Sequence, residues 1–501
     1  GGAVRGNLEV TPFYTDASLT TLSSKIGDDS DSGSQNGSTG FVDVAASDLA
    51  GSGTAADPYV ITNASELQAI EDDPAAHYEL VTDIDASGTA EWNDGKGFVP
   101  INRFSGTLNG TGNTIDELTI DRPSEAGGGL INVLEENGGI VDIRVTNLKL
   151  TGDYNLGGLV GGSNAGLIKN SSVDGTITAS GNDIGGLVAF NNGTIADSNF
   201  SGKISGDKGV GGIAGDNEIE GKIKDSYATG EVTAKNNNVG GIVSENGGVI
   251  RNSVATAAVR GNLTDGFNTG GLVGINGKTD TEGTVESSYA TGSVEGDSNV
   301  GGLVGRNFNG TIEESYAAGT VKGSSVGGLV GFNGGTVTNS YWDTESTGHA
   351  DSDGSATGLS TAQMTGAAAE TNMTGFAFRT TWETQPNDYP TLIGTDIPTT
   401  TQVQLSNVQL QPATVGSPAN HTLSFTMSGV SADGQTDTIS IGLPDGVTIV
   451  DVSNPRSTDT AYGVTATNQN NPIELAVDPD SAADTVSLDV NVTLRLKATG
   501  I

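Results

Sequence analysis

Acidic side chains that recur along the chain are the first candidates for chemistry. Four of them fall into two neighbouring columns when the repeats described below are aligned: Asp225, Glu286, Glu313 and Glu314. A polysaccharide lyase or hydrolase needs clustered carboxylates with a positioned basic residue. The basic residues nearby lie at unequal offsets in the repeats: Arg251, Arg260 and Arg306. A solvated acidic face therefore explains the columns better than catalysis, and we expect no enzyme activity.

Metal chemistry has few candidate ligands. The chain has no cysteine and three histidines, His77, His349 and His421, which are far apart in sequence. The acidic loop Asp351–Asp353 offers oxygen ligands for Ca²⁺, but it lacks the full spacing of a calcium repeat. A solvated loop is the favoured interpretation, and we predict no cofactor.

One aligned column is rich in tyrosine. It contains Ser172, Asn199, Tyr227, Val254, Tyr289, Tyr316 and Tyr341, and the next column contains Val173, Phe200, Ala228, Ala255, Ala290, Ala317 and Trp342. Adjacent positions of a strand face opposite ways, so the column that tolerates Ser and Asn should face outward. Tyr227, Tyr289, Tyr316 and Tyr341 then predict an exposed aromatic stripe for sugar rings or a partner. The alternative is that these tyrosines cover the rod or pack under the adjoining segment.

A repeated glycine pair followed by small apolar residues marks the strands that must position these residues. The first glycines of the eight copies are Gly128, Gly157, Gly185, Gly211, Gly240, Gly270, Gly301 and Gly327. Successive differences between these numbers are 29, 28, 26, 29, 30, 31 and 26 residues. A period of this length is typical of a repeat architecture.

One period predicts three short strands and no helix. Between residues 299 and 323, we expect strands over 300–305, 311–316 and 320–322, separated by turns. Such a unit cannot bury its apolar face alone, but stacked copies share a continuous core. The sequence therefore predicts an all-β chain built on a right-handed parallel β-helix (β-solenoid), with eight turns spanning about 40 Å.

The same residues resemble the GLUG motif of bacterial and archaeal surface proteins. The pattern is Gly-Gly-Leu-Val-Gly-x-Asn, followed by Gly-x-Ile/Val-x-x-Ser-Tyr-Ala-Thr-Gly-x-Val. Its best copies span residues 239–259, 270–294, 300–321 and 326–341. The resemblance covers roughly residues 51–395 and implies an extracellular β-helix, sometimes adhesive and sometimes appended to a peptidase.

The charge balance restricts the partners. The chain has 61 Asp and Glu against 22 Lys and Arg, a formal net charge of −39. This excess argues against nucleic-acid and anionic-membrane partners. Salt near saturation screens charges over about 3 Å or less, which makes such a surface tolerable. We therefore expect an extreme halophile, with an acidic secreted protein of a mesophile as the alternative.

Location is indicated by glycosylation sequons and by the absence of long apolar runs. No run reaches about 18 apolar residues, so we expect no direct membrane insertion. Candidate N-glycosylation sites are spread over the chain: Asn36, Asn63, Asn109, Asn170, Asn192, Asn199, Asn262, Asn309, Asn372, Asn420 and Asn491. Their spread favours an exported, cell-surface protein.

The chain divides into four predicted parts. Residues 1–26 form an N-terminal strand segment, and residues 27–50 an Asp/Ser/Gly-rich linker. The β-helix with its end caps takes residues 51–395. Its N-terminal cap should begin with a strand at Tyr59 and a short helix capped by Asn63. Residues 396–501 alternate apolar and polar positions, which predicts an immunoglobulin-like β-sandwich.

These observations predict a non-enzymatic surface protein, an adhesin or a pilus-like filament subunit. The candidate donor strand is Val4, Leu8, Val10 and Phe13, since an isolated strand leaves its backbone groups unpaired. Insertion into the sandwich of another copy would build a head-to-tail homopolymer. Cell-surface glycans or proteins are the other expected partners. The alternative function is a carbohydrate-binding or carbohydrate-degrading β-helix, such as a viral receptor-binding spike.

Overall fold

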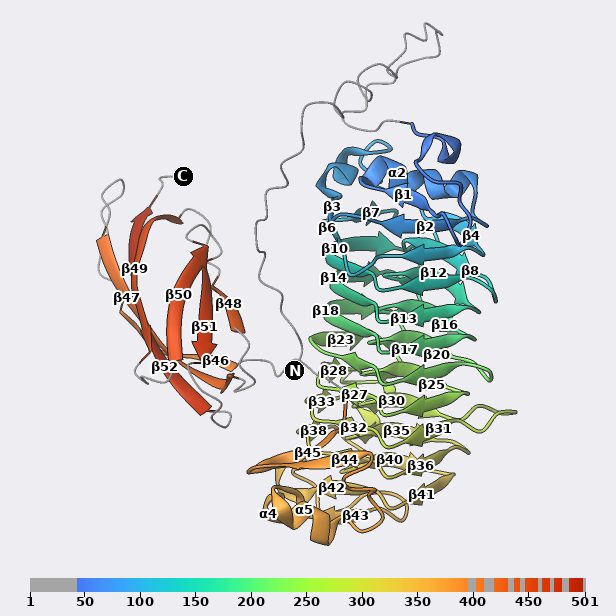
Figure 1. Cartoon of the computed structure of the whole chain (residues 1–501). Helices are drawn as coiled ribbons and strands as arrows, with labels where there is room; N and C mark the ends of the chain where they lie inside the picture. The colour runs from blue at the N-terminus through green and yellow to red at the C-terminus, as the bar shows by residue number, and fades with distance from the viewer. Residues whose placement is uncertain are drawn as a thin grey trace, which may run out of the picture. The chain divides into compact units, whose positions relative to one another are not determined.

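Most of the chain is a stack of short parallel strands. The structure is a computed structural model that describes residues 43–394 in full and, beyond them, the backbone of seven strands between residues 402 and 498. Within residues 43–381, the strands form four parallel sheets that run along one axis (Figure 1). The predicted parallel β-solenoid is confirmed.

Two of the sheets are long. The first contains β1 (Tyr59–Ile61), β2 (His77–Leu80), β5 (Thr107–Asn109), β9 (Gly139–Val141), β13 (Leu167–Lys169), β17 (Thr194–Ala196), β21 (Lys222–Lys224), β26 (Val249–Arg251), β31 (Thr284–Glu286), β36 (Thr311–Glu313) and β41 (Thr336–Thr338). The second contains β3 (Ile84–Asp85), β6 (Thr114–Asp116), β7 (Thr119–Asp121), β10 (Arg144–Gly152), β14 (Ser172–Ala179), β18 (Asn199–Gly206), β22 (Tyr227–Ala228), β23 (Glu231–Ala234), β27 (Val254–Ala255), β28 (Ala258–Arg260), β32 (Tyr289–Ala290), β33 (Val294–Glu295), β37 (Tyr316–Ala317), β38 (Val321–Lys322), β42 (Tyr341–Asp343) and β43 (Thr357–Leu359).

The other two sheets flank the glycine pairs. The third contains β11 (Leu156–Gly157), β15 (Ile184–Gly185), β19 (Val210–Gly211), β24 (Val239–Gly240), β29 (Phe267–Gly270), β34 (Ser298–Gly301) and β39 (Val326–Gly327). The fourth contains β4 (Ile101–Phe104), β8 (Ile131–Leu134), β12 (Val160–Asn164), β16 (Val188–Asn191), β20 (Ala214–Asn217), β25 (Val243–Asn246), β30 (Val273–Asn276), β35 (Val304–Asn307) and β40 (Val330–Asn333).

Each turn of the solenoid, called a rung below, therefore has more strands than the three predicted. The expected strand over 300–305 is divided between β34 and β35, because the glycine pair forms a corner. A Cβ on Gly302 would lie 2.2 Å from the carbonyl oxygen of Gly328, so only glycine fits there. The expected strand over 311–316 breaks at Glu314, whose φ is 46°. The eleven strands of the first sheet span roughly 50 Å at the usual strand spacing.

The interior is apolar and continuous along the rod. In the first sheet, one fully buried apolar residue per rung points inward: Leu108, Ile140, Ile168, Ile195, Ile223, Ile250, Val285 and Ile312. Each such side chain stabilises the fold by roughly 1.5–3 kcal/mol relative to leaving it in water.

Two polar ladders also run through the buried interior. At the ends of successive strands from β12 to β40, a buried or partly buried asparagine donates its Nδ2 to the Oδ1 of the next, at 2.7–3.0 Å. Its members are Asn164, Asn191, Asn217, Asn246, Asn276, Asn307 and Asn333. We call it the asparagine ladder. It satisfies amides that would be costly to bury alone.

The second, the serine ladder, lies at the corner before the second sheet. It contains Ser171, Ser198, Ser226, Ser253, Ser288, Ser315 and Ser340, all buried. Each Oγ donates to the carbonyl two residues earlier, at 2.7–2.9 Å. Most also accept the backbone N–H of the serine one rung earlier. The two ladders add side-chain hydrogen bonds between rungs to those of the backbone.

Short helices close the N-terminal end of the stack. They are η1 (Ala46–Asp48), α2 (Ala64–Gln68), η2 (Ala69–Asp72) and η3 (Ser87–Glu91). Asn63 Oδ1 accepts the backbone N–H of Glu66 at 3.0 Å, as the predicted cap requires. Residues Leu67 and Ile70 face inward and are fully buried.

After the last full rung, the chain turns back along the rod. It forms α3 (Thr344–Thr347), α4 (Thr361–Met364) and α5 (Ala367–Asn372), then the antiparallel hairpin β44 (Trp382–Gln385) and β45 (Asp388–Leu392). The sequence Ser360-Thr-Ala-Gln predicts one capped helix through about Glu370, but the structure has two, α4 and α5. They are separated at Gly366, whose φ of 59° is incompatible with a continuous helix.

The C-terminal strands belong to a separate compact unit. They are β46 (Gln402–Gln409), β47 (Ala419–Val430), β48 (Asp437–Ile441), β49 (Val447–Ser457), β50 (Tyr462–Asn468), β51 (Ile473–Pro479) and β52 (Val486–Ala498). They form two antiparallel sheets, in the orders β46-β47-β52-β49 and β48-β51-β50. The predicted antiparallel β-structure is confirmed, and its immunoglobulin-like type stays a prediction.

Candidate functional site

The corner between the first and second sheets presents a row of polar side chains. Its residues adopt the left-handed backbone conformation with φ between 44° and 55°: Asp142, Asn170, Asp197, Asp225, Asn252, Ser287, Glu314 and Asn339. Asp and Asn tolerate this conformation better than other residues with a side chain, which explains why they dominate the row.

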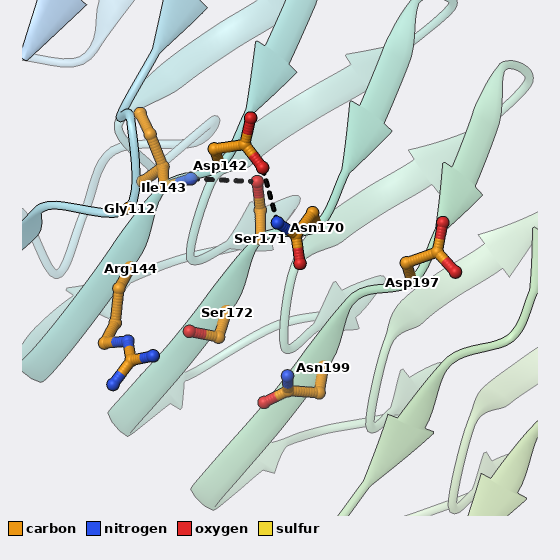
Figure 2. Close-up of a pocket in the computed structure, with 9 residues that line it drawn as sticks. All are labelled: Gly112, Asp142, Ile143, Arg144, Asn170, Ser171, Ser172, Asp197 and Asn199. Carbon is orange, nitrogen blue, oxygen red and sulfur yellow. Dashed lines mark hydrogen bonds between the residues drawn. The ribbon is translucent and has the colours of Figure 1, made fainter. Parts of the chain in front are cut away.

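Part of this row lines a small hollow, which we call the corner pocket. It has a volume of about 140 Å³ and is lined by Gly112, Asp142, Ile143, Arg144, Asn170, Ser171, Ser172, Asp197 and Asn199. Figure 2 shows Asp142, Asn170 and Asp197 in one row, with Arg144, Ser172 and Asn199 on three successive strands beside them. Ser171 Oγ accepts the backbone N–H of Ile143 at 3.3 Å, and Asn170 Nδ2 donates to Asp142 Oδ1.

The predicted carboxylate columns are present but form no cluster. Glu286 pairs with Arg251 at 2.5 Å, and Asp225 accepts a hydrogen bond from Asn252 at 3.0 Å. Burial raises the pKa of Glu314, and the neighbouring Glu313 raises it further. Within the described residues, no group of three or more His, Asp or Glu side chains is placed to hold a metal ion.

The acidic loop Asp351–Asp353 closes the last rung. Asp353 Oδ2 accepts the backbone N–H of Asn333 at 2.8 Å, and Ser352 Oγ accepts that of Val330 at 2.9 Å. The oxygens considered as Ca²⁺ ligands are therefore partly used as hydrogen-bond acceptors within the fold.

The tyrosine column has the predicted register and faces away from the core. Tyr289, Tyr316 and Tyr341 occupy equivalent positions on β32, β37 and β42. The prediction that they are exposed is wrong, because they are 4%, 0% and 5% exposed. The alternative is correct for these three: the segment after the last rung packs over them. Tyr227, at the equivalent position on β22, is half-buried.

The covering segment contributes Phe376, Trp382 and Tyr389. The Tyr289 and Tyr316 rings are stacked 4.8 Å apart, and Trp382 lies 5.9 and 5.7 Å from them. Tyr316 donates its hydroxyl to the carbonyl of Pro390 at 2.7 Å. Burial raises the pKa of Tyr289 and of Tyr316 well above the usual value. Its place in the sequence, after the last repeat, predicts that Trp382 covers the C-terminal end of the solenoid, but in the structure Trp382 covers this lateral face.

A partly buried ion cluster on the outer face of the fourth sheet was not predicted. Lys278, from the loop between β30 and β31, reaches Asp216 at 2.6 Å and Glu218 at 3.2 Å. Burial raises the pKa of Asp216 to about 7, although Lys278 acts to lower it. Asp183 is close enough for its pKa to be affected by Lys278 as well. The insert Gly277–Glu282, which lengthens one repeat, predicts only a protruding loop from the sequence.

A second unpredicted feature is a stacked arginine. The guanidinium of Arg306 lies 4.8 Å from the ring centre of Phe308 and 5.5 Å from that of Phe332. Both rings are partly exposed, at 38% and 44%. Of the other two arginines considered for catalysis, Arg251 pairs with Glu286 and Arg260 with Glu295 at 3.1 Å. The three arginines therefore converge on no common site.

The sequons in the described residues lie at the surface or partly buried, and none is fully buried: Asn63, Asn109, Asn170, Asn192, Asn199, Asn262, Asn309 and Asn372. Asn420 and Asn491 lie in β47 and β52, where only the backbone is described. Asn36 and the candidate donor strand, Val4, Leu8, Val10 and Phe13, lie outside the described residues. Glycosylation of the sequons and the role of the candidate donor strand stay predictions.

The comparisons with known proteins agree with this architecture. The family model "The GLUG motif" matches residues 152–178, 265–295 and 296–322. Halomucin of Haloquadratum walsbyi is 38% identical over 372 residues, which is 73% of this chain and 3% of halomucin. A Gly-rich membrane protein of Evansella cellulosilytica is 36% identical over 422 residues, 68% of this chain and 45% of that protein. The chain thus spans less than half the length of either relative.

Two solved structures named for immunoglobulin A1 proteases are also similar. One, from Bacteroides ovatus, has a TM-score of 0.38 and 19% identity, and covers 68% of this chain and 94% of its own. The other has a TM-score of 0.39 and 20% identity, and covers 56% of this chain and 21% of its own. None of the helices that the structure describes has the length and hydropathy of a membrane span. The three motif matches and the register of the strands identify this chain as a parallel β-solenoid that contains GLUG-motif repeats.

Proposed function

We propose that the chain is a non-enzymatic structural segment of an extracellular, cell-surface protein of a halophile, in which the solenoid acts as a rigid spacer. The observation that carries the proposal is the pair of ladders. The asparagine ladder joins every rung from β12 to β40 to the next, and the serine ladder adds hydrogen bonds at most of the same steps. Buried hydrogen-bond networks of this kind hold a structure in one arrangement when every member is satisfied. The similarity to halomucin supports a halophile surface protein.

The surface charge supports the same environment. The net charge of −39 is spread over the chain, and several described ion pairs join exposed side chains. Exposed pairs of this kind stabilise a fold by at most about 1 kcal/mol each. They cannot offset general repulsion among carboxylates, so the spacer should need concentrated salt.

Salt titration and mechanical unfolding test the spacer role. Lowering the salt from about 1 M to about 0.1 M lengthens the screening distance from roughly 3 to roughly 10 Å, so the melting temperature should fall. Sodium sulphate of equal ionic strength controls for ion identity. In molar salt, pulling on single molecules should show a high unfolding force for residues 152–345. Equal stability at both salt concentrations would contradict the halophile assignment, and a low force would contradict the spacer.

The finer proposal is that copies assemble head-to-tail into an adhesive filament. Residues 4–22 have the alternation of a strand, and β46, β48, β49 and β50 lie at the edges of the two C-terminal sheets. A sheet edge can accept an added strand from another chain. Replacing residues 4–22 by a Gly/Ser segment of equal length should abolish polymerisation, and the same replacement of residues 27–42 should not. Unchanged polymers in the first variant would exclude donor-strand assembly.

Carbohydrate recognition is a second candidate function, and the corner pocket is the observation that favours it. An enzyme would need its acid and base groups positioned together at the reacting bond. Incubation with acidic polysaccharides and with peptides should therefore give no products. Product formation that is lost in an Asp142→Asn variant would replace the non-enzymatic proposal.

A further inference from the structure

The corner pocket exists because small residues interrupt a column of large ones. On the outward face of the second sheet, Ser172 and Asn199 occupy the positions that Tyr227 and Val254 occupy in the next two rungs. Further along, the same positions hold Tyr289, Tyr316 and Tyr341, which the covering segment buries. At Ser172 and Asn199, the smaller side chains leave space beside the corner row.

The polar groups around this space are largely unused. The side chains of Arg144, Ser172, Asp197 and Asn199 form no hydrogen bond or ion pair with any other residue in the described part of the chain. Elsewhere in the same corner row, Asp225 is engaged by Asn252 at 3.0 Å. Four side chains without a hydrogen bond or ion pair therefore lie together at this hollow.

The types of these groups indicate the class of ligand. Carboxylates accept two hydrogen bonds, while guanidinium and amide groups donate them. A pair of neighbouring sugar hydroxyls offers both donors and acceptors, so it matches this mixed set. Asp142 and Asp197 outnumber Arg144, which disfavours anionic sugars. Asp142 and Asp197 lie two rungs apart, roughly 10 Å along the axis.

We propose that the corner pocket binds a neutral hexose unit of a glycan carried by another molecule. Asp197 and Asn199 hold adjacent hydroxyls, Arg144 donates to a further ring or hydroxyl oxygen, and Ser172 leaves the space for the ring. The volume of about 140 Å³ suits one such unit rather than a longer chain. This site deepens the adhesive part of the proposed function, and the spacer role does not depend on it.

Binding is tested on the full chain, produced without glycosylation and kept in about 2 M salt. The probes are oligosaccharides of glucose, galactose and mannose, with oligogalacturonate as the anionic comparison. We expect at least one neutral probe to bind, with weaker binding of oligogalacturonate. Absence of neutral binding at about 10 mM, or stronger binding of oligogalacturonate, overturns the proposal.

Variants locate the site. Ser172→Tyr restores the large residue that other rungs carry, and it should weaken binding by at least about tenfold. Ser163→Tyr is the matched control, since it lies on the outer face of the fourth sheet next to Phe190 in register. Asp197→Asn keeps the shape and should also weaken binding about tenfold. Wild-type affinity in both Ser172→Tyr and Asp197→Asn overturns the assignment.

The chain's own sequons supply a separate check, because Asn170 and Asn199 line the hollow. Mass spectrometry of the protein from its native source should find both unmodified. A glycan on either residue would occupy the space itself and would overturn binding of another molecule's glycan. Neither result changes the expected salt dependence of the solenoid, so failure of this site is distinguishable from failure of the spacer.

Discussion

Lys278 Nζ lies 2.6 Å from Asp216 Oδ2, although 62 residues separate the two in sequence. The loop after β30 folds back over the outer face of the fourth sheet and brings one ammonium to Asp216 and Glu218. Asp216 is largely removed from water, and Asp183 and Glu245 add negative charge nearby. The position of this loop and the protonation state of Asp216 therefore depend on each other.

The first prediction concerns the pH dependence of stability. Burial raises the pKa of Asp216 from 3.8 to about 7, so between these values the folded state binds more protons than the unfolded state. Its contribution to stability is therefore largest at low pH and falls as pH rises through about 7. The melting temperature of Asp216→Asn, measured relative to wild type, should rise between pH 5 and pH 8.

The control for this prediction is Asp121→Asn, an exposed position on β7. Its difference from wild type should stay constant over the same pH range. A constant difference for Asp216→Asn as well would show that Lys278 keeps Asp216 ionised throughout.

The second prediction concerns the asparagine ladder. Asn246→Leu removes the acceptor of Asn217 Nδ2 and the donor to Asn276 Oδ1, at 2.8 Å each. Each buried group left without a partner costs about 1–3 kcal/mol, so the denaturant midpoint should fall clearly. Asn333→Leu, at the end of the ladder, breaks one such bond and should cost less. Asn192→Leu, exposed at a turn, is the control, and equal losses for all three would exclude a role for the ladder.

The third prediction concerns the glycine corners. A Cβ on Gly241 would lie 2.1 Å from the carbonyl oxygen of Gly271 and 2.6 Å from Ala255 Cβ. Gly241→Ala should therefore lower the free energy of unfolding by about 1–3 kcal/mol or more. Gly88→Ala, where no atom lies within 4 Å of the added Cβ, should have little effect. Thermal unfolding of both variants at one salt concentration measures the difference. If Gly241→Ala melts like wild type, the close contact between this corner and Gly271 is wrong, and so is the register assigned to these two rungs.

The fourth prediction concerns the covered tyrosines. Trp382→Ala removes a fully buried side chain, at a cost of about 3–5 kcal/mol, and uncovers Tyr289 and Tyr316. Burial is the main cause that raises their pKa, so exposure should lower it towards the ordinary value near 10. Absorbance titration should show more tyrosines ionising at moderate alkaline pH. Trp382→Phe should keep them covered, and an unchanged titration of Trp382→Ala would mean that other residues bury the rings.

The register of the solenoid could be predicted because the glycine pairs fix the phase of every repeat. Alignment placed Tyr289, Tyr316 and Tyr341 in one outward column, and the strands pair in that register. The strand breaks could not be predicted in the same way. Whether Gly301–Gly302 continues a strand or turns a corner depends on the backbone of the next rung, which approaches too closely for any Cβ.

The segment that covers the outward tyrosine column could not be predicted from the sequence either. Periodicity predicts which way Tyr316 points, but the carbonyl of Pro390, which accepts a hydrogen bond from the Tyr316 hydroxyl, lies 74 residues away in sequence. The same holds for Lys278 and Asp216, because one is in an insertion with no equivalent in other repeats. The asparagine and serine ladders did leave a signal, since both residues recur at fixed places in the repeat. Predicting their hydrogen bonds would have required knowing that these positions face each other inside the rod.

The asparagine ladder also gives the rod an electrical direction. Each hydrogen bond of the ladder runs from the Nδ2 of one asparagine to the Oδ1 of the asparagine one rung later, so the amide dipoles point the same way and add. The oxygen end meets the backbone N–H of Gly166 at 3.0 Å, and the nitrogen end meets the carbonyl of Gly335 at 3.3 Å. Aligned peptide dipoles in a helix act as partial charges at its two ends. By the same reasoning, the interior dipoles give the two ends of this solenoid partial charges of opposite sign.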